Sequence, residues 1–215
     1  MPFSGIRTSS SEASAPPRGD LAVIACGALA KHCADISQRR GWDLHIAPLP
    51  PLLHNHPEQI AERVRACAVE LMPRYSRVVI GYADCGTYGA LDAVCAELQL
   101  ARLPGLHCYD VFGGSSAVRQ MFDEEPGTYV LTDYLVRSFT RSVLVELGLD
   151  RHPELHQDYF GHYTRVVWLA QDPADGSLQA LAQEAAAALR LPLKVVPTAD
   201  SGLELALAEL LTISR

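Results

Sequence analysis

Short apolar runs alternate with longer stretches of helical composition along most of the chain. Apolar runs bounded by turn residues are typical of buried parallel strands, and we expect strands at residues 21–25, 44–48, 77–82, 101–104, 165–170 and 193–197. We expect helices at residues 28–40, 57–75, 90–98, 133–147, 174–191 and 202–213, with a further helix beginning near residue 115. This alternation predicts an α/β fold with a mainly parallel sheet and flanking helices. It leaves open whether the elements divide into two Rossmann-like lobes.

Residues at the carboxyl ends of the expected strands are the first candidates for a functional site. Right-handed crossovers bring the carboxyl ends of parallel strands to one edge of a sheet. Ligands of open α/β sheets bind along that edge. We therefore expect the functional residues to follow the apolar runs directly.

Composition limits the classes of protein to which the chain can belong. Of its 215 residues, 48% are hydrophobic and 20% are charged, with a formal net charge of −7. Residues 1–20 are rich in Ser, Ala, Pro and Gly and contain no apolar core, so we expect a disordered tail before a single α/β domain at residues 21–215. No run approaches the ~18 apolar residues of a membrane helix, and no basic block is present. These features predict a cytoplasmic protein that binds neither membranes nor nucleic acid.

Three of the six cysteines follow expected strands. Cys26, Cys85 and Cys108 come one to four residues after apolar runs, whereas the other three, Cys33, Cys67 and Cys95, fall inside expected helices. A disulfide framework does not suit a reducing compartment. The helical cysteines are therefore read as small core residues, and the strand-end cysteines as one polar site with metal-ligating thiols.

The sequence does not decide whether such a site holds a metal, or which metal it would hold. Thiolates and a histidine suit a tetrahedral zinc ion, while three thiolates can hold three irons of a [4Fe–4S] cluster and leave the fourth iron for substrate. A third reading is a metal-free site in which one cysteine is a nucleophile beside a histidine base. The plain alternative is that all are buried free thiols.

Polar residues near these cysteines complete the candidate site. His54, Asp84 and His107 are the catalytic candidates, because imidazole and carboxylate groups transfer protons or orient one another. The substrate-binding candidates are Asn55, Thr87 and Tyr109. For Asp84 the alternative role is turn capping, at which aspartate is efficient.

Several strings, in order, resemble one family. They are ACGALA at 25–30, LPPLLHNHPEQI at 49–60, YADCGTYG at 82–89, PGLHCYDVF at 104–112, LGLDRHPEL at 147–155 and YFGHYTRVVWLAQ at 159–171. The chain is similar in these strings to the DUF1638 family, whose name declares no function. The resemblance implies Cys26, Cys85 and Cys108 as the family's cysteines. Many members have His-Asp-Cys where this chain has Leu106, His107 and Cys108.

The resemblance also implies a metabolic setting. Family members are similar to proteins encoded beside corrinoid-dependent methyltransferases, corrinoid proteins and their reactivating factors. The hypothesis is therefore a zinc or iron–sulfur protein, with enzyme favoured over adaptor, acting on a small molecule in one-carbon or corrinoid-linked methyl metabolism. The alternative is a non-catalytic partner, or cofactor-loading protein, of a corrinoid protein or methyltransferase. A homo-oligomer stays open.

Overall fold

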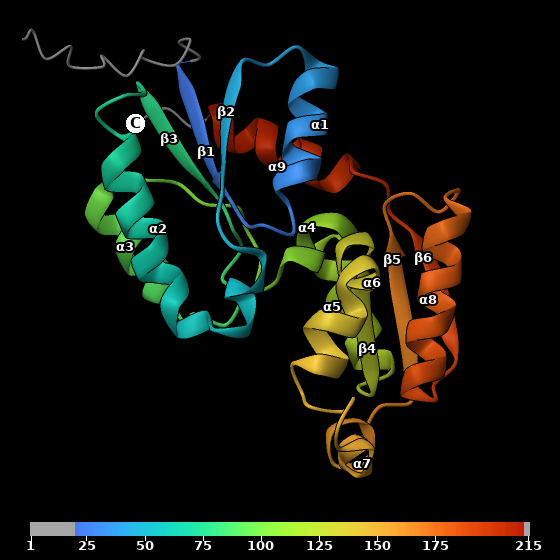
Figure 1. Ribbon diagram of the computed structural model, residues 1–215. Coiled ribbons are helices and arrows are strands. Elements are labelled where there is room, and N and C mark those ends of the chain that lie inside the picture. The colour runs from blue at the N-terminus through green and yellow to red at the C-terminus, as the bar shows by residue number, and fades with distance from the viewer. Residues whose placement is uncertain (1–19, 213–215) are drawn as a thin grey trace, which may run out of the picture.

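Two parallel sheets organise the chain. The structure, a computed structural model, describes residues 20–212, so the expected disordered tail lies outside the described residues except for Asp20. Each sheet has three strands and is flanked by helices, and the two form separate lobes (Figure 1). The α/β class and the parallel strands predicted from the apolar runs are confirmed, and the division into two lobes is resolved.

The first lobe has the strand order β2-β1-β3. Its strands are β1 (Leu21–Ala25), β2 (Leu44–Pro48) and β3 (Arg77–Gly81), and its helices are α1 (Ala30–Arg40), α2 (Pro57–Leu71), α3 (Ala90–Leu98) and α9 (Ser201–Thr212). Helices α2 and α3 cover one face of the sheet, and α1 and α9 the other (Figure 1). Burial on both faces explains the continuous apolar sequence of β1, in which residues 22–25 are wholly buried.

The second lobe has the strand order β4-β5-β6. Its strands are β4 (Thr128–Thr132), β5 (Arg165–Ala170) and β6 (Leu193–Pro197), and its longer helices are α4 (Cys108–Gly113), α5 (Ser115–Glu124), α6 (Asp133–Phe139) and α8 (Gly176–Leu189). Its short helical segments are η2 (Thr140–Val145), η3 (Pro153–Leu155) and α7 (His156–Phe160), whereas η1 (Pro51–Asn55) precedes α2 in the first lobe. Alternate residues of β5 pack on opposite faces: Trp168 joins the cluster under α6 and α8, and Leu169 contacts the α5 side.

The last helix returns to the first lobe. Leu203, Leu207 and Leu210 of α9 are buried in the core of the first sheet. Glu204 pairs with Arg39 through an N–O distance of 2.6 Å and also pairs with Arg40, both at the end of α1. The chain therefore crosses between the lobes twice, which ties them together. Across the part of the chain that the structure describes, no helix is both long and apolar enough to cross a membrane.

Two of the expected elements differ from the structure. Residues 101–104 form an isolated bridge between Ile80 and Arg102 instead of a strand, held by the Ile80 amide to the Ala101 carbonyl at 2.8 Å and the Leu103 amide to the Ile80 carbonyl at 3.0 Å. The expected helix at 133–147 is α6 followed by the π-helical segment η2. Strand β4 and helix α4 were not predicted as regular elements.

Candidate functional site

The crevice between β1 and β3 is the natural ligand edge of the first lobe. The chain leaves central β1 for β2 on one side and then crosses to β3 on the other. Ligands of open α/β sheets bind at such a switch point, beyond the carboxyl ends of the two strands. Cys26 directly follows β1 and Cys85 lies four residues beyond β3, so both flank this crevice.

Backbone hydrogen bonds hold each cysteine in place. The Cys26 amide donates to the Gly81 carbonyl at 3.0 Å, and the Cys26 carbonyl accepts from the amides of Leu29 and Ala30 at 2.8 Å each. The Cys85 amide donates to the Leu106 carbonyl at 2.7 Å, which joins the loop after β3 to the loop before α4.

The joined loops place Cys85 against Cys108. Cys108 begins α4 and lies close enough to Cys85 to influence the pKa of its thiol. Cys85 itself has a left-handed backbone (φ 53°), which is followed by Gly86 at φ 82°. A non-glycine residue keeps this conformation only where its surroundings impose it, and such residues cluster at functional sites.

The three thiols share one electrostatic environment. Burial raises the pKa of Cys85 to about 12, and repulsion by Cys26 adds to the effect. Burial raises the pKa of Cys108 well above its ordinary value, and both Cys85 and Cys26 reinforce the shift. The pKa of Cys26 is likewise raised by burial. The structure thus brings the three predicted cysteines together as neutral thiols, each poorly suited to act alone as a nucleophile.

The Tyr82 hydroxyl lies among these thiols. Burial raises the Tyr82 pKa above its usual range, and Cys26, Cys85 and Cys108 all contribute to the increase. The side chain is wholly buried, and its hydroxyl interacts with the Cys26 thiol without forming a hydrogen bond of ordinary geometry. A buried O–H donor without a hydrogen-bond partner therefore lies near the thiol cluster, defined here as Cys26, Cys85 and Cys108.

The described residues do not form a ready-made site for a single metal ion. Within residues 20–212, no group of three or more His, Cys, Asp or Glu side chains is arranged to hold one metal ion. The six cysteines, all inside this range, are free thiols. The thiol cluster is thus an electrostatic cluster and not a preformed tetrahedral site.

Asp84 and Thr87 are occupied by their own loop. The Asp84 carboxylate accepts from the Thr87 hydroxyl at 2.7 Å and from the Tyr88 and Gly89 amides at 3.2 and 3.1 Å. Burial raises the Asp84 pKa, but these hydrogen bonds outweigh it and hold the pKa below its usual range. The geometry matches the capping role weighed for Asp84, and it gives Thr87 a structural partner.

His54, Asn55 and Tyr109 line one cavity of about 450 Å³ between the lobes. The His54 Nδ1 lies 2.7 Å from the Pro51 carbonyl oxygen. A carbonyl oxygen can only accept, so the His54 Nδ1 is the donor in this contact. Tyr109 connects this cavity to the thiol cluster, because Cys108 and Cys85 contribute to its raised pKa after burial and Asp110.

His107 lies outside that cavity. Its exposed ring stacks on Tyr109, with centroids 4.7 Å apart, and it lines a neighbouring hollow of about 540 Å³ that contains Arg102 and Arg119. His54 and His107 therefore belong to different hollows, which meet at Tyr109 and Phe122.

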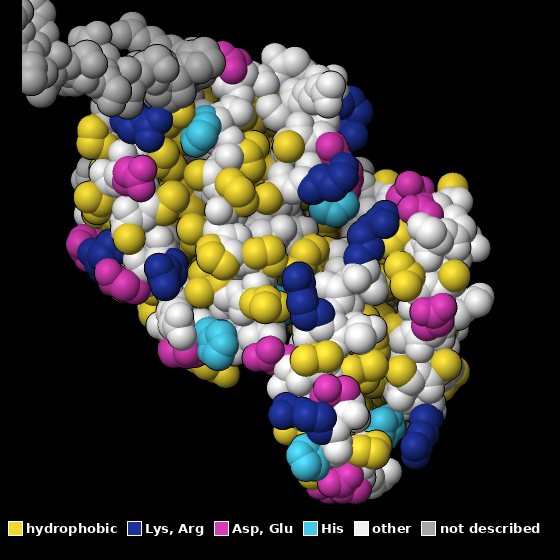
Figure 2. Space-filling model, in the orientation of Figure 1, with side chains coloured by type: hydrophobic (Ala, Val, Ile, Leu, Met, Phe, Trp, Pro, Cys, Tyr) yellow, Lys and Arg dark blue, Asp and Glu magenta, His cyan; other side chains and the backbone are white. Residues whose placement is uncertain are grey.

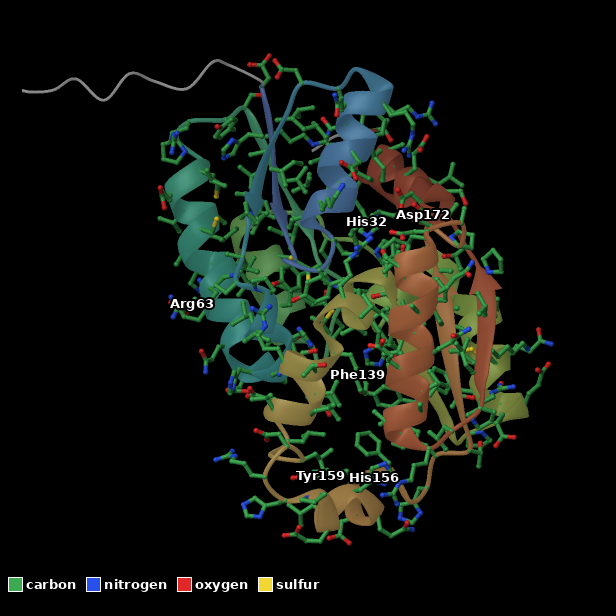
Figure 3. All side chains as sticks on the ribbon, turned by 45° about the vertical axis from the view of Figure 1, so that its right-hand side comes forward. His32, Arg63, Phe139, His156, Tyr159 and Asp172 are labelled. Atoms are coloured by element: carbon green, nitrogen blue, oxygen red, sulfur yellow. The ribbon has the colours of Figure 1, made fainter. Side chains whose placement is uncertain are left out.

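A third, charged cleft of about 360 Å³ lies where the lobes meet, and Figure 2 shows basic, acidic and histidine side chains gathered there. In Figure 3, His32 on α1 and Asp172 after β5 lie on either side of the boundary. The His32 Nδ1 is 2.9 Å from an Asp200 oxygen. Sequence reasoning missed this cleft, because its residues come from both lobes and only the tertiary structure brings them together.

We expect the cluster thiols of chelator-treated protein to react slowly with iodoacetamide. At a pKa of about 12, about one Cys85 thiol in ten thousand is ionised at pH 8. Alkylation of Cys85, followed by mass spectrometry, should be at least ~10-fold slower than that of half-buried Cys67 and should rise through pH 10. A rate that levels off near pH 7 would contradict the burial argument.

Fold and site together define a two-lobed α/β protein with a thiol-lined crevice at the switch point of its first sheet. The chain belongs to the family described as Protein of unknown function (DUF1638), whose model matches residues 48–207. Cys85 and Cys108 lie inside the matched range, and Cys26 lies before it. Searches of curated proteins and of solved structures found no match.

Proposed function

We propose that the protein is a metal-dependent enzyme in which Cys26, Cys85 and Cys108 hold a metal centre beside a small-molecule pocket. The observation that carries the proposal is that three thiols from three separate loops belong to or pack against one core and lie near enough to raise one another's pKa. Buried free cysteines need no such proximity, because each can pack in its own apolar surroundings.

The energetics of the thiol cluster favour a cationic occupant. Without a cation, burial and mutual repulsion keep the thiols protonated. A bound metal supplies the opposite charge and converts coordinating thiols to thiolates. Tyr82 would then donate to a negatively charged sulfur, and such hydrogen bonds tune the properties of a metal centre.

Of the two candidate metals, we take a [4Fe–4S] cluster as the one to test first. A zinc ion needs thiolate sulfurs about 3.8 Å apart, from tetrahedral geometry at 2.3 Å. A [4Fe–4S] cluster takes each thiolate on a different iron. When bound through three thiolates, it supplies one iron that can bind substrate.

We propose that the protein acts in one-carbon or corrinoid-linked methyl metabolism. This part of the proposal rests only on the resemblance to DUF1638 proteins. A corrinoid protein or a methyltransferase is the proposed partner. An adaptor role would keep partner binding independent of the thiols. Loss of activity in Cys85→Ser with partner binding intact would favour an enzyme.

The test is elemental analysis and a visible spectrum of protein purified without oxygen. We expect a brown protein with about four irons and four sulfides per chain, and at least ~10-fold less iron in Cys85→Ser and Cys108→Ser. Cys67→Ser and Cys95→Ser, on helices α2 and α3, are the matched controls and should keep the iron. A colourless protein with one zinc would select the other metal. Equal loss in all four variants, or no metal at all, would end the proposal.

A further inference from the structure

The 450 Å³ cavity beside the thiol cluster is walled by both lobes. Segment η1 supplies His54 and Asn55 from the first lobe, and α4 supplies Tyr109. The remaining walls belong to the second lobe and consist of Phe122, Pro126, Thr128, Tyr129, Val130, Leu135, Ser142, Val143 and Tyr163. Its volume falls in the range of about 300–1,000 Å³ that is typical of small-molecule sites.

The lining of this cavity contains no carboxylate, ammonium or guanidinium group. Four aromatic rings and several apolar side chains form the walls, and hydroxyl, amide and imidazole groups provide the polar contacts. Burial raises the pKa of Tyr129 to about 12, so this phenol is neutral at physiological pH. The charged cleft at the lobe boundary, with Lys31, Arg137 and Asp172, has the opposite character.

An irregular helix shapes one wall. Helix α6 continues into the π-helical segment η2, which places Ser142 and Val143 at the cavity. π-helical turns are rare, and they are frequently found at functional sites. This observation is independent of the cysteines and points to the same cavity.

We propose that this cavity binds an uncharged small molecule with a planar, apolar body and a hydrogen-bonding edge. Aromatic walls bind planar groups by stacking, and the uncharged, mostly half-buried lining offers no charged partner to an ion that loses part of its hydration. The inference rests on the proposed function, since it takes the cavity as the substrate site of the metal centre. It adds the charge and shape of the substrate.

Three probes that share one ring and differ in charge test the proposal: benzyl alcohol, benzoate and benzylammonium. Binding to the full chain is measured by ligand-observed NMR and calorimetry, with and without metal. We expect benzyl alcohol to bind at least ~10-fold more tightly than either ion. Tyr163→Phe removes one hydroxyl of the lining and should weaken benzyl alcohol by about 2- to 10-fold. Tyr159→Phe, exposed and outside the cavity, is the matched control and should have no effect.

The outcomes separate this inference from the proposed function. Equal or tighter binding of either ion, no binding of benzyl alcohol, or an equal effect of Tyr159→Phe and Tyr163→Phe would overturn the inference, whatever the metal content. Selective binding of benzyl alcohol to a protein that never holds metal would instead support the cavity and overturn the metal centre.

Discussion

Replacing Asp133 with alanine is expected to lower the free energy of unfolding by about 3–5 kcal/mol. The buried Asp133 carboxylate accepts from the Trp168 indole N–H at 2.9 Å and from the amides of Gln171 and Asp172 at 3.0 and 2.8 Å. Truncation leaves all three donors without an acceptor, and at least two of them are buried. Urea denaturation followed by tryptophan fluorescence measures the change.

Two variants bracket this expectation. Asp133→Asn keeps one acceptor oxygen and should lose less stability than Asp133→Ala. Asp123→Ala removes an exposed carboxylate from α5 and should change the free energy of unfolding by no more than about 0.5 kcal/mol. If Asp133→Ala were as stable as Asp123→Ala, the three hydrogen bonds would not organise the ends of β4 and β5 as described.

A second large loss of stability is expected for Gly27→Ala, in the loop that follows β1. A Cβ atom at Gly27 would lie 2.6 Å from the Pro51 Cα and 2.7 Å from the Leu49 carbonyl oxygen. Because these are backbone atoms, the segment that carries His54 must shift, and we expect a loss of about 1–3 kcal/mol. Benzyl alcohol should also bind more weakly, because His54 lines its proposed cavity.

Gly176→Ala is the control for this prediction. Gly176 begins α8, and a Cβ there would meet nothing within 4 Å, so the substitution should leave stability unchanged or slightly improved. Thermal unfolding of both variants gives the comparison. A Gly27→Ala protein with wild-type stability and probe affinity would show that the loop can adjust without cost, contrary to the close packing described.

Most strands were predictable, and the less regular elements were not. Strands β1, β2, β5 and β6 match their expected bounds, and in β1 and β5 the buried positions form an unbroken apolar run. Strand β4 contains two threonines and was missed. Residues 101–104 were expected to form a strand but form only a bridge at Arg102. An apolar run does not show whether the hydrogen bonds to the neighbouring strand continue along it.

The candidate site residues, too, were only partly predictable from the sequence. The strand-end position of Cys26, Cys85 and Cys108 was visible in the sequence, and so was their shared sheet edge. Their gathering near Tyr82 was not, because it depends on a hydrogen bond between two loops, from Cys85 to Leu106. The separation of His54 from His107 likewise depends on where the Tyr109 ring lies.

By itself, the sequence determined the α/β class, the parallel strands and the identity of the chemically capable side chains, because periodicity and strand-end position are local properties. Only the tertiary structure decided that there are two sheets and that α9 rejoins the first. It also decided that a neutral cavity and a charged cleft lie at the boundary between the lobes. These features arise from contacts between residues far apart in the chain, and no local pattern encodes which distant surfaces will meet.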